Sequence, residues 1–387
     1  MKESYPLISV LVLCYNNQKY LYDNLKSIFS QTYPNIEVLI SDDASDDFNA
    51  SILINWIAKN KTFNIKKISI YENQFNIGTV ASLENLQKKS EGEFLFNIAA
   101  DDVFFDNDVL LSLYKKAKEV GDDAQVILAE VEMWDEKLEN KIGCFLKEEG
   151  LEKIKNSTAL DLFSECSWHP FLPACYLYHR NLLDIIGDLS QKYSLIEDWP
   201  SQIIFCREGI KPVLCDIKST IKHRDGGISH GNSLDSKLAF LRYYHDFYQV
   251  YINEVEPFIS RLSVKDGKRA KGYATDRFRA YYKIHLPKVM NLISKSKEVV
   301  KVVEKISTPI MQEYSYSNKF RRIALKLSDK KNIIYYILVF IAVICVSVFA
   351  YVNYYRDLTI ILMFLLGNMC CFVFSMIILY FGWRKHQ

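Results

Sequence analysis

Apolar runs alternate with segments of helical periodicity through the first 135 residues of the chain. The runs are rich in Val, Ile, Leu and Phe, which predicts buried strands. They cover residues 8–13, 36–40, 65–71, 93–99 and 124–134. Between them, apolar residues at helical spacing predict helices near residues 19–30, 49–59, 79–89 and 107–119. This repetition is typical of an α/β fold with a largely parallel sheet, in which ligands bind beyond the carboxyl ends of the strands.

The pattern changes after residue 232, where helical periodicity continues with prolines between the helices. The chain then closes with two runs that contain no charged residue, 332–355 and 358–383. Each is longer than the roughly 20 apolar residues that cross a bilayer, so we predict two transmembrane helices in a hairpin. A buried hairpin of a soluble core is the alternative. The predicted division is an α/β head, a basic helical juxtamembrane region, and the hairpin with a short cytoplasmic tail, over residues 1–231, 232–331 and 332–387.

Charge is distributed unevenly along the chain, although the net charge is only +2. Residues 261–331 carry 19 Lys and Arg against 6 Asp and Glu, whereas residues 1–260 carry 26 against 39. A basic segment beside a membrane span favours anionic lipid headgroups, or the pyrophosphate of a lipid-linked substrate, over nucleic acid. Basic residues flank both ends of the hairpin, which predicts a multi-pass protein of the inner (cytoplasmic) membrane with its head in the cytoplasm. Nine cysteines without C-x-x-C spacing fit that reducing compartment.

Polar clusters follow three of the predicted strands. They are residues 14–17 (CYNN), 41–47 (SDDASDD) and 99–102 (AADD). Neighbouring carboxylates repel one another unless a cation or hydrogen-bond donors compensate, so paired aspartates at two strand ends indicate a divalent metal or a donor-rich ligand. Taken singly, each cluster can also be explained as a helix N-cap.

These clusters belong to an ordered set of motifs: SVLVLCYNN, EVLISDDASDD, NIGTVASLEN, GEFLFNIAADDVF, IEDW and HRDGGIS. In this order the set resembles the inverting family 2 glycosyltransferases of the bacterial polysaccharide-assembly type, over about residues 6–230. The resemblance implies the GT-A fold, a Rossmann-like, mostly parallel sheet that binds nucleotide-diphospho-sugars. It also implies transfer of a sugar from such a donor, with a UDP-sugar expected here.

Several residues are assigned to the nucleotide by the resemblance. Tyr15 resembles the aromatic residue that packs on the uracil ring, and Asp42 the carboxylate that accepts from the base, with Asp43 beside it. The loop and helix near the nucleotide and donor sugar are matched by Asn76, Gly78 and Asn85. Gly78 can equally be a helix-start turn that requires no side chain.

The family's metal motif commonly reads D-x-D-D, and here Ala99 stands in its first place. By resemblance, Asp101 holds Mg²⁺ or Mn²⁺ against the diphosphate and Asp102 supports it. His223 is a candidate to complete the metal shell, although a histidine and an arginine after a strand often form only a solvated turn. Arg224 resembles the residue that closes over the diphosphate, because a guanidinium forms charge-assisted bonds to phosphate.

Glu197 and Asp198 stand at the start of another predicted helix. Asp198 resembles the general base of the family, with Glu197 positioning it or the acceptor, whereas the bland reading makes Asp198 a helix N-cap. One base suffices because a metal stabilises the leaving nucleoside diphosphate. The sequence therefore predicts a membrane-anchored inverting glycosyltransferase that acts on a hydroxyl of a lipid-linked saccharide during cell-surface polysaccharide assembly.

Other classes of function fit the sequence less well. The motifs of P-loop NTPases and dinucleotide-binding dehydrogenases are missing, and strand-end carboxylate pairs suit a metal-diphosphate better than the cleft of a glycoside hydrolase. A non-catalytic membrane scaffold or glycan-binding protein with a degenerate head is the alternative, and Ala99 is its main support.

Overall fold

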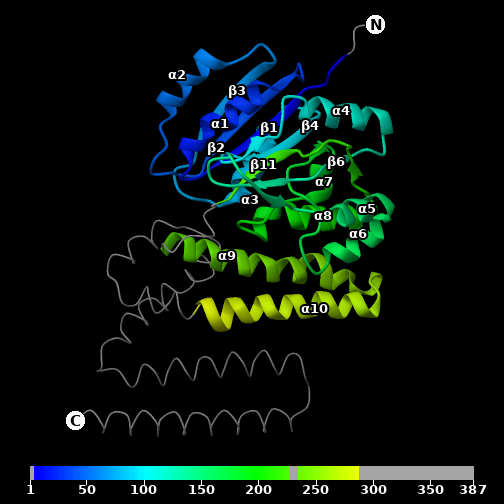
Figure 1. Cartoon of the computed structure of the whole chain (residues 1–387). Coiled ribbons are helices and arrows are strands. Elements are labelled where there is room, and N and C mark those ends of the chain that lie inside the picture. Colours follow the sequence, from blue (N-terminus) through cyan, green and yellow to red (C-terminus); the bar gives the residue numbers. More distant parts are fainter. Residues whose placement is uncertain (1–3, 226–233, 287–387) are drawn as a thin grey trace, which may run out of the picture. The chain divides into compact units, whose positions relative to one another are not determined.

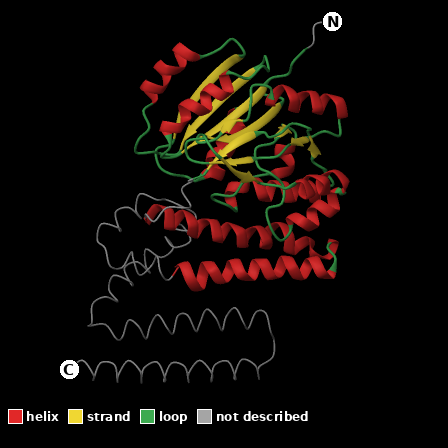
Figure 2. Ribbon diagram, in the orientation of Figure 1, coloured by secondary structure: helices red, strands yellow, loops and turns green. Residues whose placement is uncertain are grey.

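A seven-stranded sheet forms the centre of the head. The computed structural model describes residues 4–225 and 234–286 (Figures 1 and 2). In spatial order the sheet contains β10 (Val213–Leu214), β6 (Val126–Leu128), β9 (Leu177–His179), β4 (Phe94–Ala99), β1 (Ile8–Cys14), β2 (Ile36–Asp42) and β3 (Ile65–Glu72). Only β9 runs antiparallel to its neighbours, so the sheet is mostly parallel, as predicted.

Helices cover both faces of this sheet, and alternation along each strand divides the core in two. On β1, Ile8, Val10 and Val12 face one cluster and Leu11 faces the other. The first cluster is closed by α1 (Gln18–Phe29), α2 (Ala50–Asn60) and α4 (Val109–Val120). The second is closed mainly by α3 (Thr79–Lys89), α5 (Glu148–Asn156), α6 (Ala159–Cys166), α7 (Leu182–Ile186) and α8 (Asp198–Arg207).

A second sheet of four strands lies at the carboxyl-end edge of the first. Its order is β5 (Val103–Phe104), β11 (Ile221–Arg224), β7 (Glu132–Trp134) and β8 (Lys141–Cys144). The antiparallel pairing of β11 with β5 sets Lys222 opposite Val103. The residues that precede β5 and those that end β11 are therefore brought together, although about 120 residues separate them in the chain.

The predicted elements of the first 120 residues are all present, with boundaries within two residues or so. The strand predicted over residues 124–134 is wrong as a single element, because the chain forms β6 in one sheet and β7 in the other. Buried Glu130 lies between them and accepts the N–H groups of Val131 and Leu146, each at 2.9 Å. The Val131 N–H therefore donates to a side chain and not to a neighbouring strand, and β6 ends before it.

Residues 234–286 fold as helices, and these pack onto the head. They are α9 (Leu234–Val250), η3 (Tyr251–Val255), η4 (Glu256–Arg261), α10 (Val264–Phe278) and η5 (Arg279–His285), with η1 (Leu189–Gln191) earlier in the chain. Phe247 and Val250 of α9 and Ala270 of α10 belong to the second core cluster. Within residues 4–225 and 234–286, no helix is long and apolar enough to cross a membrane. The predicted hairpin, 332–355 and 358–383, lies outside the described residues.

Candidate active site

The carboxyl ends of β1, β2 and β4 open into a cavity of about 930 Å³. The register sets Cys14 beside Asp42 and Leu13 beside Ala99, so the residues that follow the three strands meet at one edge. Nine of the predicted site residues line the cavity: Tyr15, Asp43, Asn76, Gly78, Asp101, Asp102, Glu197, Asp198 and His223. Asp42, Asn85 and Arg224 do not line it, and Asn85 is exposed on α3.

The two neighbouring aspartates after β2 have different surroundings. Asp42 is buried, and its carboxylate accepts the N–H of Ser45 at 3.0 Å and the hydroxyl of Ser45 at 2.5 Å. Asp43 lines the cavity and accepts the N–H groups of Ile77 and Gly78, at 2.8 and 2.9 Å. Asp42 therefore shapes the turn that follows β2, whereas Asp43 holds the loop before α3 against the cavity.

Gly78 is required by both its backbone and its surroundings. Its φ of 91° lies in the region that L side chains rarely adopt. A Cβ atom placed on it would lie 2.7 Å from the carbonyl oxygen of Ser194, which also accepts the N–H of Val80 at 3.2 Å. The glycine therefore lets the loop before α3 contact the segment that leads into α8.

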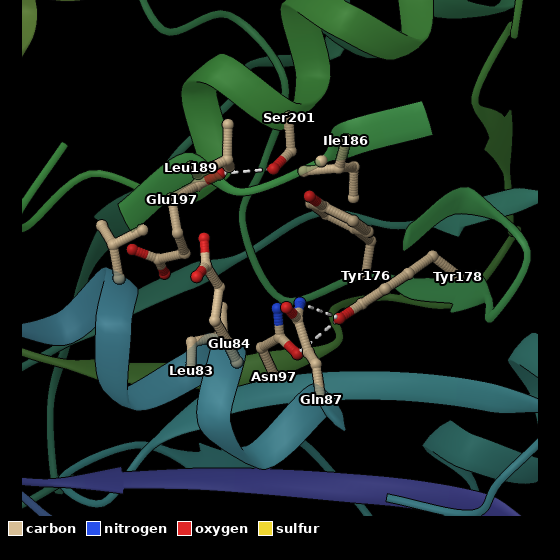
Figure 3. Close-up of a pocket in the computed structure, with 12 residues that line it drawn as sticks. Leu83, Glu84, Gln87, Asn97, Tyr176, Tyr178, Ile186, Leu189, Glu197 and Ser201 are labelled. Carbon is tan, nitrogen blue, oxygen red and sulfur yellow. Dashed lines mark hydrogen bonds between the residues drawn. The ribbon is translucent and has the colours of Figure 1, made fainter. Parts of the chain in front are cut away.

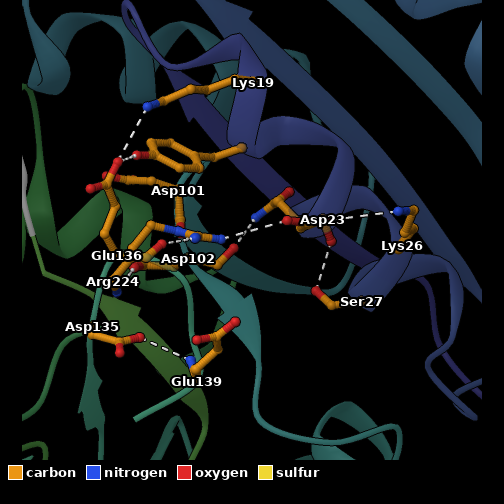
Figure 4. A network of polar contacts seen from close by, with 12 residues as sticks. Lys19, Asp23, Lys26, Ser27, Asp101, Asp102, Asp135, Glu136, Glu139 and Arg224 are labelled. Atoms are coloured by element: carbon orange, nitrogen blue, oxygen red, sulfur yellow. Dashed lines mark hydrogen bonds and ion pairs between the residues drawn. The ribbon is translucent and has the colours of Figure 1, made fainter. Parts of the chain in front are cut away.

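Asp102 is engaged with β11, and Asp101 faces the cavity (Figure 4). The Asp102 carboxylate, 3% exposed, lies 3.0 Å from His223 Nδ1 and accepts the backbone N–H of Arg224 at 3.0 Å. That hydrogen bond raises the pKa of His223 to about 9, so the imidazole is protonated near neutral pH. Burial and the charge of Asp102 raise the pKa of Asp101 to about 6.

These contacts bear on the predicted metal ligands. Among residues 4–225 and 234–286, no group of three or more His, Cys, Asp or Glu side chains is arranged to hold a metal ion. Asp102 already occupies the Nδ1 side of His223, which leaves Nε2 as the ring nitrogen that could bind a metal. Of the three predicted ligands, Asp101 alone combines a cavity position with a carboxylate that no other side chain is shown to bind.

Arg224 is 5% exposed, does not line the cavity, and lies among Asp101, Asp102 and Glu136 (Figure 4). Its guanidinium donates to the carbonyl oxygens of Asp101 and Glu136 and stacks on the ring of Tyr20, 4.3 Å from the centroid. Asp23 Oδ2 lies 3.7 Å from it. In this arrangement Arg224 joins β11 to the Asp101 backbone and to α1. The neighbouring residues 226–233, which include the rest of the predicted closing segment, lie outside the described residues.

Glu197 and Asp198, at the start of α8, line the same cavity as the residues that follow β1, β2 and β4. Asp198 is the first residue of α8, and its carboxylate accepts the N–H of Trp199 at 2.7 Å. Glu197 occupies the N-cap position without a side-chain capping bond, so neither carboxylate serves as an ordinary N-cap. Burial and the charge of Asp198 raise the pKa of Glu197 to about 8, and burial also raises the pKa of Asp198.

A second cavity, of about 10 Å³, adjoins Glu197 (Figure 3). Asn97, Tyr176 and Glu197 line both cavities. The hydroxyl of Tyr178 donates to Asn97 Oδ1 at 3.0 Å and accepts from Gln87 at 2.9 Å, which fixes this wall. The volume is close to the roughly 10–15 Å³ that one water molecule needs. The small cavity therefore has room for about one solvent molecule beside the Glu197 carboxyl group.

Some lining residues were not predicted from the sequence. Lys19 and Tyr20 follow the first strand-end cluster by a few residues, so their nearness in the chain was a usable signal. Arg242 and Tyr243 come from α9, within the segment that was interpreted as a connector. Their positions depend on the packing of α9, for which the sequence offers only helical periodicity.

Comparison with known proteins identifies the part of the chain that carries most of this site. Residues 9–185 match the family model described as Glycosyl transferase family 2. Residues 9–185 are therefore similar to the glycosyl transferase family 2 proteins. The matched residues supply the strand ends of the cavity, whereas Glu197, Asp198 and α9 lie after them.

Curated proteins and a solved structure are also similar to parts of this chain. An uncharacterized glycosyltransferase of Haemophilus influenzae is 35% identical over 101 residues, which are 26% of this chain and 30% of that protein. Glycosyltransferase GlyG of Streptococcus pneumoniae is 30% identical over 131 residues, 34% of this chain and 40% of that protein. The crystal structure of S. aureus TarS 1–349 superimposes with a TM-score of 0.47 at 18% identity, covering 74% of this chain and 79% of that one. The matched part thus spans less than half the length of either curated relative.

Proposed function

We propose that this protein is an inverting glycosyltransferase that moves a sugar from a nucleotide-sugar, most specifically a UDP-sugar, to an acceptor hydroxyl. One observation carries the proposal. The strand-end carboxylates of the family 2 domain and the Glu197–Asp198 pair line one cavity, although they are far apart in the chain. A nucleoside diphosphate at the strand ends and an acceptor hydroxyl beside α8 would then meet in that space.

Asp198 is the base in this proposal. The acceptor oxygen attacks the anomeric carbon, the bond from that carbon to the diphosphate oxygen breaks, and Asp198 takes the hydroxyl proton. The leaving diphosphate keeps the electron pair of the broken bond. A single displacement inverts the anomeric configuration. Burial and the charge of Asp198 raise the pKa of Glu197, which favours a state in which the pair holds one proton and carries one negative charge.

Asp101 is the residue that fits a divalent cation. Its carboxylate faces the cavity, and burial together with Asp102 raises its pKa, so a nearby positive charge would stabilise its ionised form. Mg²⁺ and Mn²⁺ accept one or two protein carboxylates together with substrate phosphates. When bound there, such an ion would stabilise the negative charge that develops on the diphosphate.

A membrane setting and a lipid-linked saccharide acceptor complete the proposal. Support comes from the two uncharged runs near the end of the chain and from the basic segment that precedes them. Within the described residues, Lys265, Lys268 and Lys271 of α10 are exposed, as expected of a helix that faces anionic headgroups. We further propose cell-surface polysaccharide assembly at the cytoplasmic membrane as the setting.

The scaffold alternative rests on Ala99, which stands in the first place of the metal motif that the resemblance implies, where an aspartate is common. Buried negative charge argues against it. Asp101, Asp102, Glu197 and Asp198 all lie at the cavity, and burial raises the pKa of three of them. Burying carboxylates lowers the stability of the folded protein, so groups of them are typical of sites that bind a ligand or perform chemistry.

The test is calorimetric titration of the purified chain with UDP, GDP and CDP, with and without Mn²⁺. We expect one nucleotide, UDP, to bind in a metal-dependent manner, and we expect Asp101→Ala to abolish that dependence. The matched control is Asp122→Ala, because Asp122 is an exposed carboxylate that does not line the cavity. Absence of nucleotide binding under every metal condition would favour the scaffold.

A further inference from the structure

α9 carries a buried carboxylate whose hydrogen bonds go to the backbone just before the Glu197–Asp198 pair. Asp246 is fully buried, at 0% exposure. Its Oδ2 atom accepts three successive backbone N–H groups, from Ser194 at 2.9 Å, Leu195 at 2.7 Å and Ile196 at 3.3 Å. Its Oδ1 atom accepts the Ser194 hydroxyl at 3.4 Å. Such a carboxylate replaces the water that these N–H groups would otherwise bind.

The segment that Asp246 holds contacts both sides of the cavity. In one direction it leads directly into Glu197 and Asp198. In the other, the Ser194 carbonyl oxygen accepts the Val80 N–H and lies against Gly78, whose own N–H donates to Asp43. The backbone of residues 194–196 therefore contacts the loop before α3 and also sets the position of the Glu197–Asp198 pair at the start of α8.

We propose that Asp246 is a positioning residue for the reaction: from α9, it fixes the 194–196 segment so that Asp198 is aimed at the acceptor hydroxyl. This inference rests on the proposed function for the role of Asp198. It goes beyond that function because α9 lies after the residues that match the family model. The same helix places Arg242 and Tyr243 in the cavity wall one turn earlier, so α9 is part of the active site as well as of the packing layer.

A second buried acid in the same helical layer provides a matched control. Glu254 is 2% exposed and lies 2.9 Å from Lys192 Nζ and 3.0 Å from Arg207 NH1. It also accepts the hydroxyl of Tyr193 at 2.9 Å. Glu254 thus joins the helical layer to the head near the same segment, but it makes no hydrogen bond to the 194–196 backbone. Its loss should lower stability without releasing that segment.

The experiment compares Asp246→Asn and Asp246→Ala with Glu254→Gln in the full chain. Amide hydrogen exchange of peptides that cover residues 194–199 reports directly on the three N–H groups. We expect exchange there to accelerate about tenfold or more in Asp246→Asn and further in Asp246→Ala. Asparagine keeps one neutral acceptor oxygen for these N–H groups, whereas alanine keeps none. Glu254→Gln should leave exchange of this segment as in the wild type.

Turnover is measured in parallel as UDP release from the UDP-sugar that binds best, with water as the acceptor when none other is known. We expect kcat to fall about tenfold to a hundredfold in Asp246→Asn, because a small displacement of the base from the acceptor hydroxyl slows the chemical step strongly. The KM for the donor should change little, since Asp43 itself holds Ile77 and Gly78. A purely structural role would instead give Asp246→Asn and Glu254→Gln equal effects at equal loss of melting temperature.

Each result decides between readings. Equal exchange of residues 194–199 in Asp246→Asn and Glu254→Gln would overturn the proposal, as would faster exchange with unchanged kcat. If the wild-type chain neither binds nor turns over any nucleotide-sugar, the proposed function fails. The exchange measurement then still decides whether Asp246 holds the segment, so the two failures are distinguishable.

Discussion

At the scale of single residues, the Glu197–Asp198 pair is the strongest candidate for chemistry. The two carboxyl groups are neighbours at one helix start, and both are partly buried, so ionising both is unfavourable. Burial raises the pKa of both groups, and the charge of Asp198 raises that of Glu197 further, which favours a pair that keeps one proton. We expect Asp198→Asn to lower turnover about 10²- to 10⁴-fold, the usual contribution of a general base. Calorimetric binding of UDP should be retained; its loss would show that Asp198 serves folding or donor binding instead.

The same pair predicts a pH dependence of stability. A carboxyl group whose pKa is higher in the folded than in the unfolded protein keeps its proton longer when folded, so stability falls as pH rises from the ordinary value of 4.5 to about 8. Glu197→Gln removes this loss. We expect the variant to melt at a higher temperature than the wild type at pH values above 8, and to differ little near pH 4. Thermal unfolding at the two extremes measures this, and an equal difference at both would contradict the raised pKa.

Gly78 yields a prediction with a control inside the chain. Gly78 and Gly121 both have φ near 90°, at 91° and 86°, but a Cβ atom on Gly121 would meet nothing within 4 Å. Both alanine variants therefore carry backbone strain, and only Gly78→Ala adds the clash with Ser194. We expect Gly78→Ala to lower the free energy of unfolding by about 1–3 kcal/mol more than Gly121→Ala, as overpacking typically does. Chemical denaturation of both variants measures the difference; equal losses would mean that the loop moves freely away from Ser194.

Residues also show where the sequence stops being informative. Asp42 and Asp43 are adjacent and chemically identical, and only the three-dimensional course of the turn decides that Asp43 faces the cavity. The resemblance predicts that Arg224 closes over the diphosphate and makes His223 a candidate metal ligand. The pairing of β11 with β5 gives both of them partners within the protein. Asp246 carried no sequence signal, because a lone aspartate on a helix is normally a solvated residue.

At the scale of elements, local periodicity was sufficient for the central sheet and its first helices. Strands β1, β2 and β4 are nearly continuous apolar runs because helices bury both of their faces, whereas the edge strand β3 exposes Lys66 and Lys67. The run over residues 124–134 looks the same in sequence, yet it divides between two sheets at Glu130. That division depends on Leu146 and on residues 219–220, which bond to Glu130 from elsewhere in the chain.

A substitution at Arg224 measures how much its contacts from β11 contribute to the stability of the protein. If its guanidinium mainly joins β11 to the Asp101 and Glu136 carbonyl oxygens, Arg224→Lys should cost about 1–3 kcal/mol of unfolding free energy, since a buried carbonyl group loses its donor. The control Arg279→Lys, at a side chain that is 64% exposed, should change stability by less than about 0.5 kcal/mol. Unchanged stability with weaker UDP binding would instead support the contact to diphosphate that the sequence resemblance implies.

At the scale of the whole molecule, the helices of residues 234–286 belong to the body that holds the cavity and are more than a connection. Phe247 and Ala270 share a core with β1 and α8, and α9 closes one wall of the cavity. Sequence could predict helices here but not their docking, because docking depends on which apolar faces meet. The division of the chain at residues 231 and 331 remains a prediction. It places a catalytic head next to a basic segment, and that arrangement has a consequence for how the protein is held.

Two physical terms would hold the full chain at a membrane, and they respond differently to treatment. Burial of the runs 332–355 and 358–383 in lipid does not depend on salt, whereas attraction of the basic residues to anionic headgroups is screened at high salt, where the Debye length falls to about 3 Å at 1 M. We expect the full chain to stay with membranes in alkaline carbonate and in 1 M salt, and a chain that ends at Lys331 to be released by both. Membrane fractionation followed by immunoblotting measures this.

Release of the full chain by carbonate would contradict the hairpin, and retention of the shortened chain in high salt would show that α9, α10 or the segment after them contributes an apolar contact of its own.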